Sequence, residues 1–170
     1  MATNTLVLYG SLRTPSDSRL LAIRAARELH LRGGNSKTFF PDDLPLFDYK
    51  SYDHPKVKEL HDLGMWADSF IWVSPEYHGG PSGVFKNQVD WLPCRDRAEK
   101  VTKGKPVVIM STTGGHQSFN TINALTINAR WLKMAVMPTH VNWQLTYQGI
   151  DERTSTRIGE SIQELINFTV

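Results

Sequence analysis

Several features that mark specialised classes of protein are missing from this sequence. Its single cysteine, Cys94, cannot form an internal disulfide, so we expect an inert Cys94 in an intracellular, cytoplasmic protein. No apolar run approaches the length of a membrane span, and the start MATNTLVLYG lacks the positive n-region of a signal peptide. The net charge is only +2 and the basic residues are dispersed, which argues against a nucleic-acid partner. Histidines and carboxylates do not recur at metal-ligand spacing, so we expect no metal site.

The pattern of apolar residues predicts one α/β domain, 1–170, because the chain shows no repeat and no low-complexity linker. Short β-rich apolar runs predict strands at 5–9, 36–40, 69–74, 105–111 and 135–143, the last weakened by an internal proline. Apolar residues at helical spacing predict helices near 21–32, 56–67, 81–93, 119–132 and 158–166. Strands that alternate with helices and are apolar throughout indicate a parallel sheet covered on both faces.

The loop after the first predicted strand, GSLRTPSDSR at 10–19, favours a phosphate group. Ligands of open α/β sheets lie beyond the carboxyl ends of the strands, and a helix is predicted to begin inside this loop with unpaired N–H groups. Ser11, Ser16 and Ser18 add hydroxyl donors, and Arg13 adds a guanidinium suited to phosphate oxygens. The loop has neither the lysine of a P-loop nor the GxGxxG spacing, which disfavours nucleoside triphosphates and dinucleotides. The alternative is a serine that only caps the helix beside solvated arginines.

The loops after the third and fourth predicted strands favour a flat heterocycle. In SPEYHGGPSGVFK the paired glycines let the backbone approach a ring, and Tyr77 and His78 can stack on it or meet its edge. Glu76 either braces this loop or contacts the ligand. In STTGGHQSFN, Gly114 and Gly115 can offer main-chain N–H groups to the polar edge of a heterocycle. An ordinary turn explains each loop alone, but three such loops at one edge of a sheet point to a ligand.

The segments GSLRTPSDSR, SPEYHGGPSGVFKNQVDW and TTGGHQSFN, in this order and spacing, resemble the NAD(P)H-dependent FMN reductase family. The longer match HGGPSGVFKNQVDWLP, with GGHQSFNTINAL and RWLKM, is most similar to the arsenical-resistance (ArsH) branch of that family. The resemblance implies a flavodoxin-like, doubly wound sheet of five parallel strands in the order 2-1-3-4-5. It also implies FMN as cofactor, with NADPH or NADH as co-substrate.

The resemblance assigns a part of the flavin site to each loop. The first loop would hold the FMN phosphate, the second would line the isoalloxazine ring, and the third would approach the other side of the ring. The residues implied are Ser11, Arg13, Ser16, Ser18 and Arg19 in the first loop, Pro75, Glu76, Tyr77, His78 and Gly79 in the second, and Thr113, Gly114, Gly115 and His116 in the third. No catalytic side chain is implied, because the flavin carries the chemistry.

The predicted function is an FMN-dependent NAD(P)H oxidoreductase. It would pass electrons by a ping-pong mechanism to a small acceptor: a quinone, azo compound, flavin, metal ion, oxygen or organoarsenical. One alternative is a flavodoxin-type electron carrier, although its docking surface should be acidic and this chain is mildly basic. The other is an interaction domain without FMN. The family also implies a homodimer or homotetramer, and Trp91 and Trp131, on helices beside the second and third loops, are either contact residues or core residues.

Overall fold

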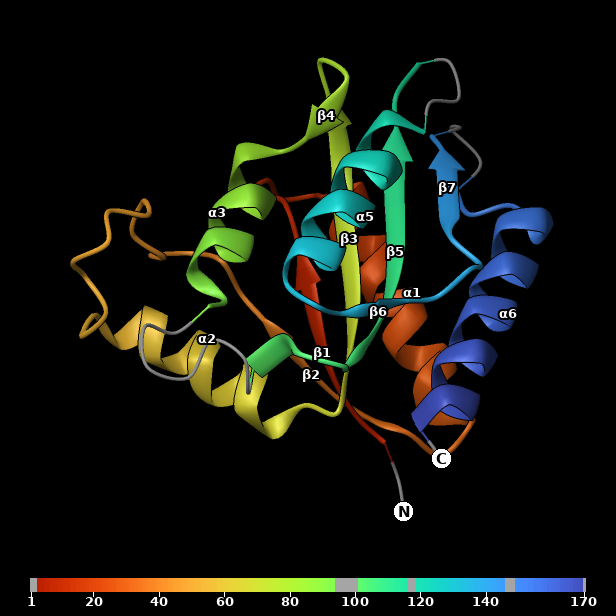
Figure 1. Ribbon diagram of the computed structural model, residues 1–170. Helices are drawn as coiled ribbons and strands as arrows, with labels where there is room; N and C mark the ends of the chain where they lie inside the picture. The colour runs from red at the N-terminus through yellow and green to blue at the C-terminus, as the bar shows by residue number, and fades with distance from the viewer. Residues whose placement is uncertain (1–2, 94–100, 116–118, 146–148, 170) are drawn as a thin grey trace.

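Six strands among the described residues pair in parallel in one sheet, and the carboxyl ends of these strands lie at the top in Figure 1. The computed structural model describes residues 3–93, 101–115, 119–145 and 149–169. The parallel strands are β1 (Asn4–Tyr9), β2 (Asn35–Phe39), β3 (Ser69–Tyr77), β5 (Pro106–Thr113), β6 (Ala135–Val136) and β7 (Val141–Gln144). Their order is β2-β1-β3-β5, and β6 and β7 both pair with β5. The short β4 (Gly80–Pro81) pairs antiparallel with β3.

Helices cover both faces of this sheet, as predicted. The helices α1 (Asp17–Leu31) and α6 (Glu152–Thr169) lie on one face, and α2 (Pro55–Trp66), α3 (Gly83–Trp91) and α5 (Asn120–Trp131) lie on the other (Figure 1). Side chains alternate between the two cores: Leu6 and Leu8 belong to the core on the side of α2, α3 and α5, whereas Val7 belongs to the core beneath α1 and α6. Among the described residues, no helix is long and apolar enough to cross a membrane. The predicted flavodoxin-like arrangement is confirmed.

The predicted fifth strand, 135–143, is interrupted. Residues 137–140 separate β6 from β7, and Pro138 within them has no N–H to donate to a ladder. The carboxylate of Glu164 on α6 accepts hydrogen bonds from the amide (2.9 Å) and the hydroxyl (2.6 Å) of Thr139. A helix side chain therefore satisfies the backbone of this edge where the sheet does not.

The third strand is longer than predicted. The sequence places its end before Pro75, but β3 continues to Tyr77. The carbonyl of Val73 accepts a hydrogen bond from the amide of Gly10 (3.0 Å), so the backbone of Val73 faces β1. The backbone nitrogen of Pro75, two residues on, points to the same side of β3. The ladder between β1 and β3 ends at the pair Tyr9–Val73, and the missing N–H of Pro75 therefore costs no hydrogen bond.

Candidate functional site

The first loop joins β1 to α1 and carries a cluster of hydroxyl groups. Ser16 is the N-cap of α1, since its Oγ accepts from the amide of Arg19 (3.2 Å), and it lies 3.1 Å from the Oγ of Ser18. The Oγ of Ser11 accepts from the amide of Arg13 at 3.1 Å. Helix geometry leaves the other amides of the first turn of α1 without intrahelical acceptors. Ser16 therefore caps the helix and still stands within a group of donors at a helix N-terminus.

Three residues that the sequence analysis did not predict fix the start of this loop against α3. Gly10 packs so closely against α3 that an added Cβ would lie 2.6 Å from the Oγ of Ser82 and 2.7 Å from the Cβ of Phe85. Ser82 is the N-cap of α3 and donates its hydroxyl hydrogen to the carbonyl of Gly10 (2.7 Å). The amide of Gln88 donates to the carbonyl of Tyr9 (2.9 Å). The sequence signal was a glycine directly after an apolar strand, where the backbone comes close to another element.

The second segment is a strand followed by a tight hairpin rather than a glycine-rich loop. His78 (φ 51°) and Gly79 (φ 80°) form the two-residue turn between β3 and β4, and both have the positive φ that such a turn requires. Tyr77, at the base of this turn, is 46% exposed. The conformation of the hairpin accounts for Gly79, so a close approach to a ring is not needed to explain it.

Glu76 braces this segment. Its Oε2 accepts a hydrogen bond from the amide of Thr121 (3.1 Å) in the first turn of α5. The N-cap of that helix, Phe119, makes no side-chain capping bond, so the carboxylate from β3 serves a helix start 45 residues away in sequence. The structure shows the bracing role of Glu76, and its contact with a ligand stays a prediction.

The third segment leaves open space. Gly114 and Gly115 follow β5, are exposed, and a Cβ added to either would meet no protein atom within 4 Å. Neither is among the residues with positive φ, so the protein itself does not require glycine at these positions. Before them, the hydroxyl of Thr113 is buried without a hydrogen-bond partner among the described residues. His116 lies outside the described residues.

A cleft of about 230 Å³ at the carboxyl edge of the sheet brings the three segments together. The predicted residues that line it are Ser11, Arg13, Ser16, Ser18, Pro75, Glu76, Tyr77 and Gly114. Asp17, Thr112 and Leu145 line it as well and were not predicted. The structure does not bring His78, Gly79, Thr113 or Gly115 to its wall. Nor does it bring Arg19, whose guanidinium lies over the ring of Phe40, 5.4 Å from the centroid.

The residues of the cleft fit FMN. Three serine hydroxyls, the guanidinium of Arg13 and the start of α1 form a donor set suited to a phosphate monoester. The carboxylate of Asp17 opposes a phosphate placed directly against it. At the other end, Tyr77 and Gly114 border the cleft, and the open space beside Gly114 can hold a flat ring. The role of each of these residues in binding FMN stays a prediction.

A parallel sheet in this order, with its cleft at the carboxyl edge beside the first strand, defines a flavodoxin-like protein. A family model described as NADPH-dependent FMN reductase matches residues 3–148. The chain belongs to this family. The resemblance proposed from the three segments, the class of oxidoreductase, and FMN with NAD(P)H as the cofactors are thereby confirmed at the level of the family.

Individual proteins agree with this assignment. The chain is 40% identical over 172 residues to the NADPH-dependent FMN reductase ArsH of Rhizobium meliloti (strain 1021), covering 97% of this chain and 71% of that protein. Among solved structures, FerB, a flavoenzyme NAD(P)H:(acceptor) oxidoreductase from Paracoccus denitrificans, has a TM-score of 0.85 at 20% identity and covers 99% of this chain and 97% of its own. A flavodoxin, WrbA-like protein from Agrobacterium tumefaciens has a TM-score of 0.70 at 15% identity, with 98% of each chain covered. These two structures show the fold.

Proposed function

We propose that the cleft binds FMN with its phosphate at the first loop, and that the protein passes electrons from NAD(P)H to a small flat acceptor by a ping-pong mechanism. The observation that carries this proposal is one cleft that joins a phosphate-type donor set to an open rim. FMN, when bound, accepts a hydride from NAD(P)H and gives two electrons to the acceptor, so the protein needs no nucleophile. The single cysteine suits a reducing cytoplasm, where NAD(P)H is available.

The shape of the rim favours successive use of one flavin face. A cleft of about 230 Å³ has no room for a second molecule beside FMN, so the exposed side above Tyr77 and Gly114 would serve both substrates. A hydrogen-bonded pocket rejects near analogues strongly, whereas an open platform discriminates weakly between them. We therefore expect several quinones and azo compounds to serve as acceptors.

Initial rates across a grid of NADPH and quinone concentrations test the mechanism. Parallel double-reciprocal lines are expected, because NADP⁺ must leave before the quinone enters. Intersecting lines would show both substrates bound together and would overturn the ping-pong proposal. The alternative of an electron carrier predicts no steady NADPH consumption with any small acceptor.

Arg13 is the position that tests the phosphate end of the cleft. One charge-assisted hydrogen bond contributes about 1.5–3 kcal/mol, so Arg13→Ala should weaken FMN binding by about ten-fold or more. Riboflavin, which lacks the phosphate, should bind the two proteins equally. Flavin fluorescence quenching measures both affinities.

Asp17 provides the matched control for that experiment. Asp17→Asn removes a negative charge from the same wall, and FMN affinity should rise or stay equal while riboflavin affinity does not change. If Arg13→Ala leaves FMN affinity as in the wild type, or weakens riboflavin to the same extent, the phosphate does not bind at the first loop.

We also propose that two copies of the chain associate through the face that carries α3 and α5. On α5, Trp131 is 86% exposed and Ile127, one turn earlier, is 68% exposed. Both line a groove of about 680 Å³ together with aromatic residues of the segment before α2, including Tyr49, which is 74% exposed. Large contiguous apolar exposure is uncommon on a monomer. The pair Lys86–Asp90 on α3 is internally neutral, so two copies of this face would not repel each other.

A further inference from the structure

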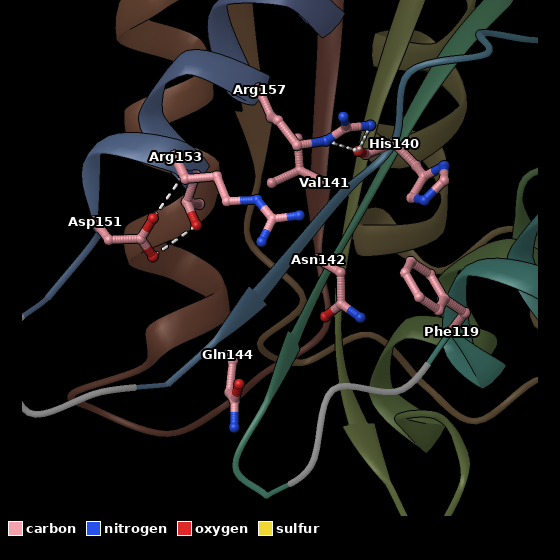
Figure 2. Close-up of a pocket in the computed structure, with 9 residues that line it drawn as sticks. Phe119, His140, Val141, Asn142, Gln144, Asp151, Arg153 and Arg157 are labelled. Atoms are coloured by element: carbon pink, nitrogen blue, oxygen red, sulfur yellow. Dashed lines mark hydrogen bonds between the residues drawn. The ribbon is translucent and has the colours of Figure 1, made fainter.

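A second cavity, separate from the flavin cleft, lies between the edge strand β7 and the start of α6 (Figure 2). It has a volume of about 350 Å³, larger than the cleft. Its walls come from both ends of β7, from the first turns of α6 and from Phe119 before α5. No step of the proposed mechanism uses these residues.

Two guanidinium groups dominate one wall of this cavity. The guanidinium of Arg153 projects into the space between α6 and β7 (Figure 2), and among the described residues no carboxylate forms an ion pair with it. Arg157 donates from Nε (3.2 Å) and Nη2 (3.1 Å) to the carbonyl of His140, which fixes its position beside the cavity.

Among the described residues of the wall, Asp151 has the only carboxylate, and other groups of the protein already bind it. Asp151 accepts from the amide and from the hydroxyl of Thr154, both at 2.8 Å. These bonds hold the pKa of Asp151 below its ordinary value, with the backbone bond from Thr154 as the main cause. The cavity therefore has an excess of positive charge at a helix N-terminus, which suits a phosphate group more than a neutral ligand.

The opposite wall is aromatic. The rings of Phe119 and His140 meet edge to face, with centroids 5.3 Å apart. Burial, and then the charge of Arg157, lower the pKa of His140, so its imidazole is neutral at pH 7. Phe119 is 45% exposed and offers a surface on which a base can stack.

The end of β7 connects the cavity to the flavin cleft. Gln144 lines the cavity, and Leu145, the next residue, lines the cleft. The side chain of Gln144 donates to the carbonyl of Gly115 (2.7 Å), in the segment that follows β5 at the flavin end. The cavity and the cleft therefore adjoin each other at the end of β7.

We infer that this cavity binds the 2′-phosphoadenosine end of NADPH, with Arg153 and Arg157 at the 2′-phosphate and Phe119 against the adenine. This inference rests on the proposed function, because NADPH must then place its nicotinamide over the flavin. NADH lacks the 2′-phosphate and leaves both guanidinium groups without a ligand. The residues of the cavity therefore make the protein selective for NADPH.

The first test compares the two nucleotides in Arg153→Ala. The guanidinium of Arg153 forms no hydrogen bond or ion pair with the described residues, whereas that of Arg157 binds the carbonyl of His140. Replacing Arg153 therefore changes the ligand contact with the least effect on the protein. The KM for NADPH should rise about ten-fold or more, while kcat and the KM for NADH stay unchanged. Arg153→Lys should recover part of the loss. Arg27→Ala, an exposed arginine on α1, is the matched control and should change neither nucleotide.

The second test measures binding without turnover. Calorimetric titration with 2′,5′-ADP should show binding to the wild type, a loss of about ten-fold or more in Arg153→Ala, and much weaker binding of 5′-AMP. Inorganic phosphate that binds as tightly as 2′,5′-ADP would reduce the cavity to a nonspecific anion site and overturn the inference.

The two proposals fail in different ways. Equal kinetic loss for NADPH and NADH in Arg153→Ala, or no loss for either, overturns the assignment of the cavity while the proposed function stands. A wild type that oxidises neither nucleotide overturns the proposed function. In that case the titrations with 2′,5′-ADP decide alone whether the cavity recognises the phosphoadenosine group.

Discussion

At the scale of single residues, glycines of the site have two opposite physical causes. Gly10 is required by the protein, since a Cβ there would lie 2.6 Å from a side-chain oxygen and 2.7 Å from a side-chain carbon of α3. Gly114 is not required by the protein, since a Cβ there meets nothing within 4 Å. Gly10 is explained by close packing against α3, whereas Gly114 borders open space that a ligand can occupy.

Gly114→Ala should therefore separate ligand contact from stability. The free energy of unfolding without FMN should stay within about 0.5 kcal/mol of the wild type, because the position is exposed and its φ is not positive. FMN affinity should fall if the ring lies against this position, as proposed. Chemical denaturation and flavin titration measure the two quantities.

Gly10→Ala is the contrasting variant. Overpacking of a tight site costs about 1–3 kcal/mol, so this variant should lose stability even without flavin. If Gly114→Ala binds FMN as tightly as the wild type, the ring does not reach this end of the cleft.

At the scale of elements, α6 stabilises the edge of the sheet that Pro138 interrupts. Glu164 satisfies the amide and hydroxyl of Thr139, and Arg157 satisfies the carbonyl of His140, so the helix replaces part of a missing strand. The start of α6 is itself fixed by Asp151. This residue precedes the helix, and its carboxylate accepts from the amide of the third helical residue, the position that an N-cap serves.

Asp151→Ala should lower the free energy of unfolding by about 1 kcal/mol at pH 7, the usual cost of a lost N-cap. Asp151→Asn keeps an acceptor and should lose less. The pKa of Asp151 is lowered in the folded protein. Its negative charge therefore stabilises the folded protein at pH values above the pKa of the unfolded carboxyl, about 3.9. That contribution declines as pH falls through the lower folded pKa. Denaturation curves at pH 7 and below pH 4 should therefore show the wild type converging on Asp151→Asn. A constant difference between them would show that the charge has no role in the cap.

At the scale of the whole molecule, the two helical layers differ in what they leave uncovered. The layer of α2, α3 and α5 has the groove around Trp131 on its surface. The layer of α1 and α6 has a groove lined by charged side chains of both helices. The residues that line the flavin cleft lie at the carboxyl edge of the sheet, and this edge is at the top in Figure 1. Association through the first layer leaves the cleft and the β7 cavity outside the groove.

Trp131→Lys should convert the associated protein into a monomer of 19.3 kDa. Its stability at low protein concentration should not change, because the side chain is 86% exposed in the single chain. Leu31→Lys, at an apolar position that is 73% exposed on α1, is the control and should leave the mass of the assembly unchanged. Multi-angle light scattering of the FMN-bound proteins gives the masses. A wild type that elutes with the monomer mass would contradict the proposal.

The two tryptophans show what a local pattern cannot decide. Both were candidates for contact or core, but Trp91 is fully buried, and the contact reading of Trp91 is wrong. The segment before α2 folds over it: its Nε1 donates to the carbonyl of Pro45 (2.7 Å), and the ring of Phe47 packs edge to face at 4.8 Å. In the part of the chain that the structure describes, no comparable segment covers Trp131. Helical spacing gives the direction of a side chain, whereas its burial depends on a segment far away in sequence.

By itself the sequence determined the alternation of strands and helices, the parallel sheet and the three segments that identify the family. These follow from apolar periodicity and from residues that are neighbours along the chain. Only the tertiary structure decided that Glu76 caps α5, that Gly10 and Ser82 lock the first loop, and that a cavity forms beside β7. Each of these depends on groups that meet from distant positions, such as Glu76 and Thr121. Packing brings such groups together, and no period in the sequence records which ones will meet.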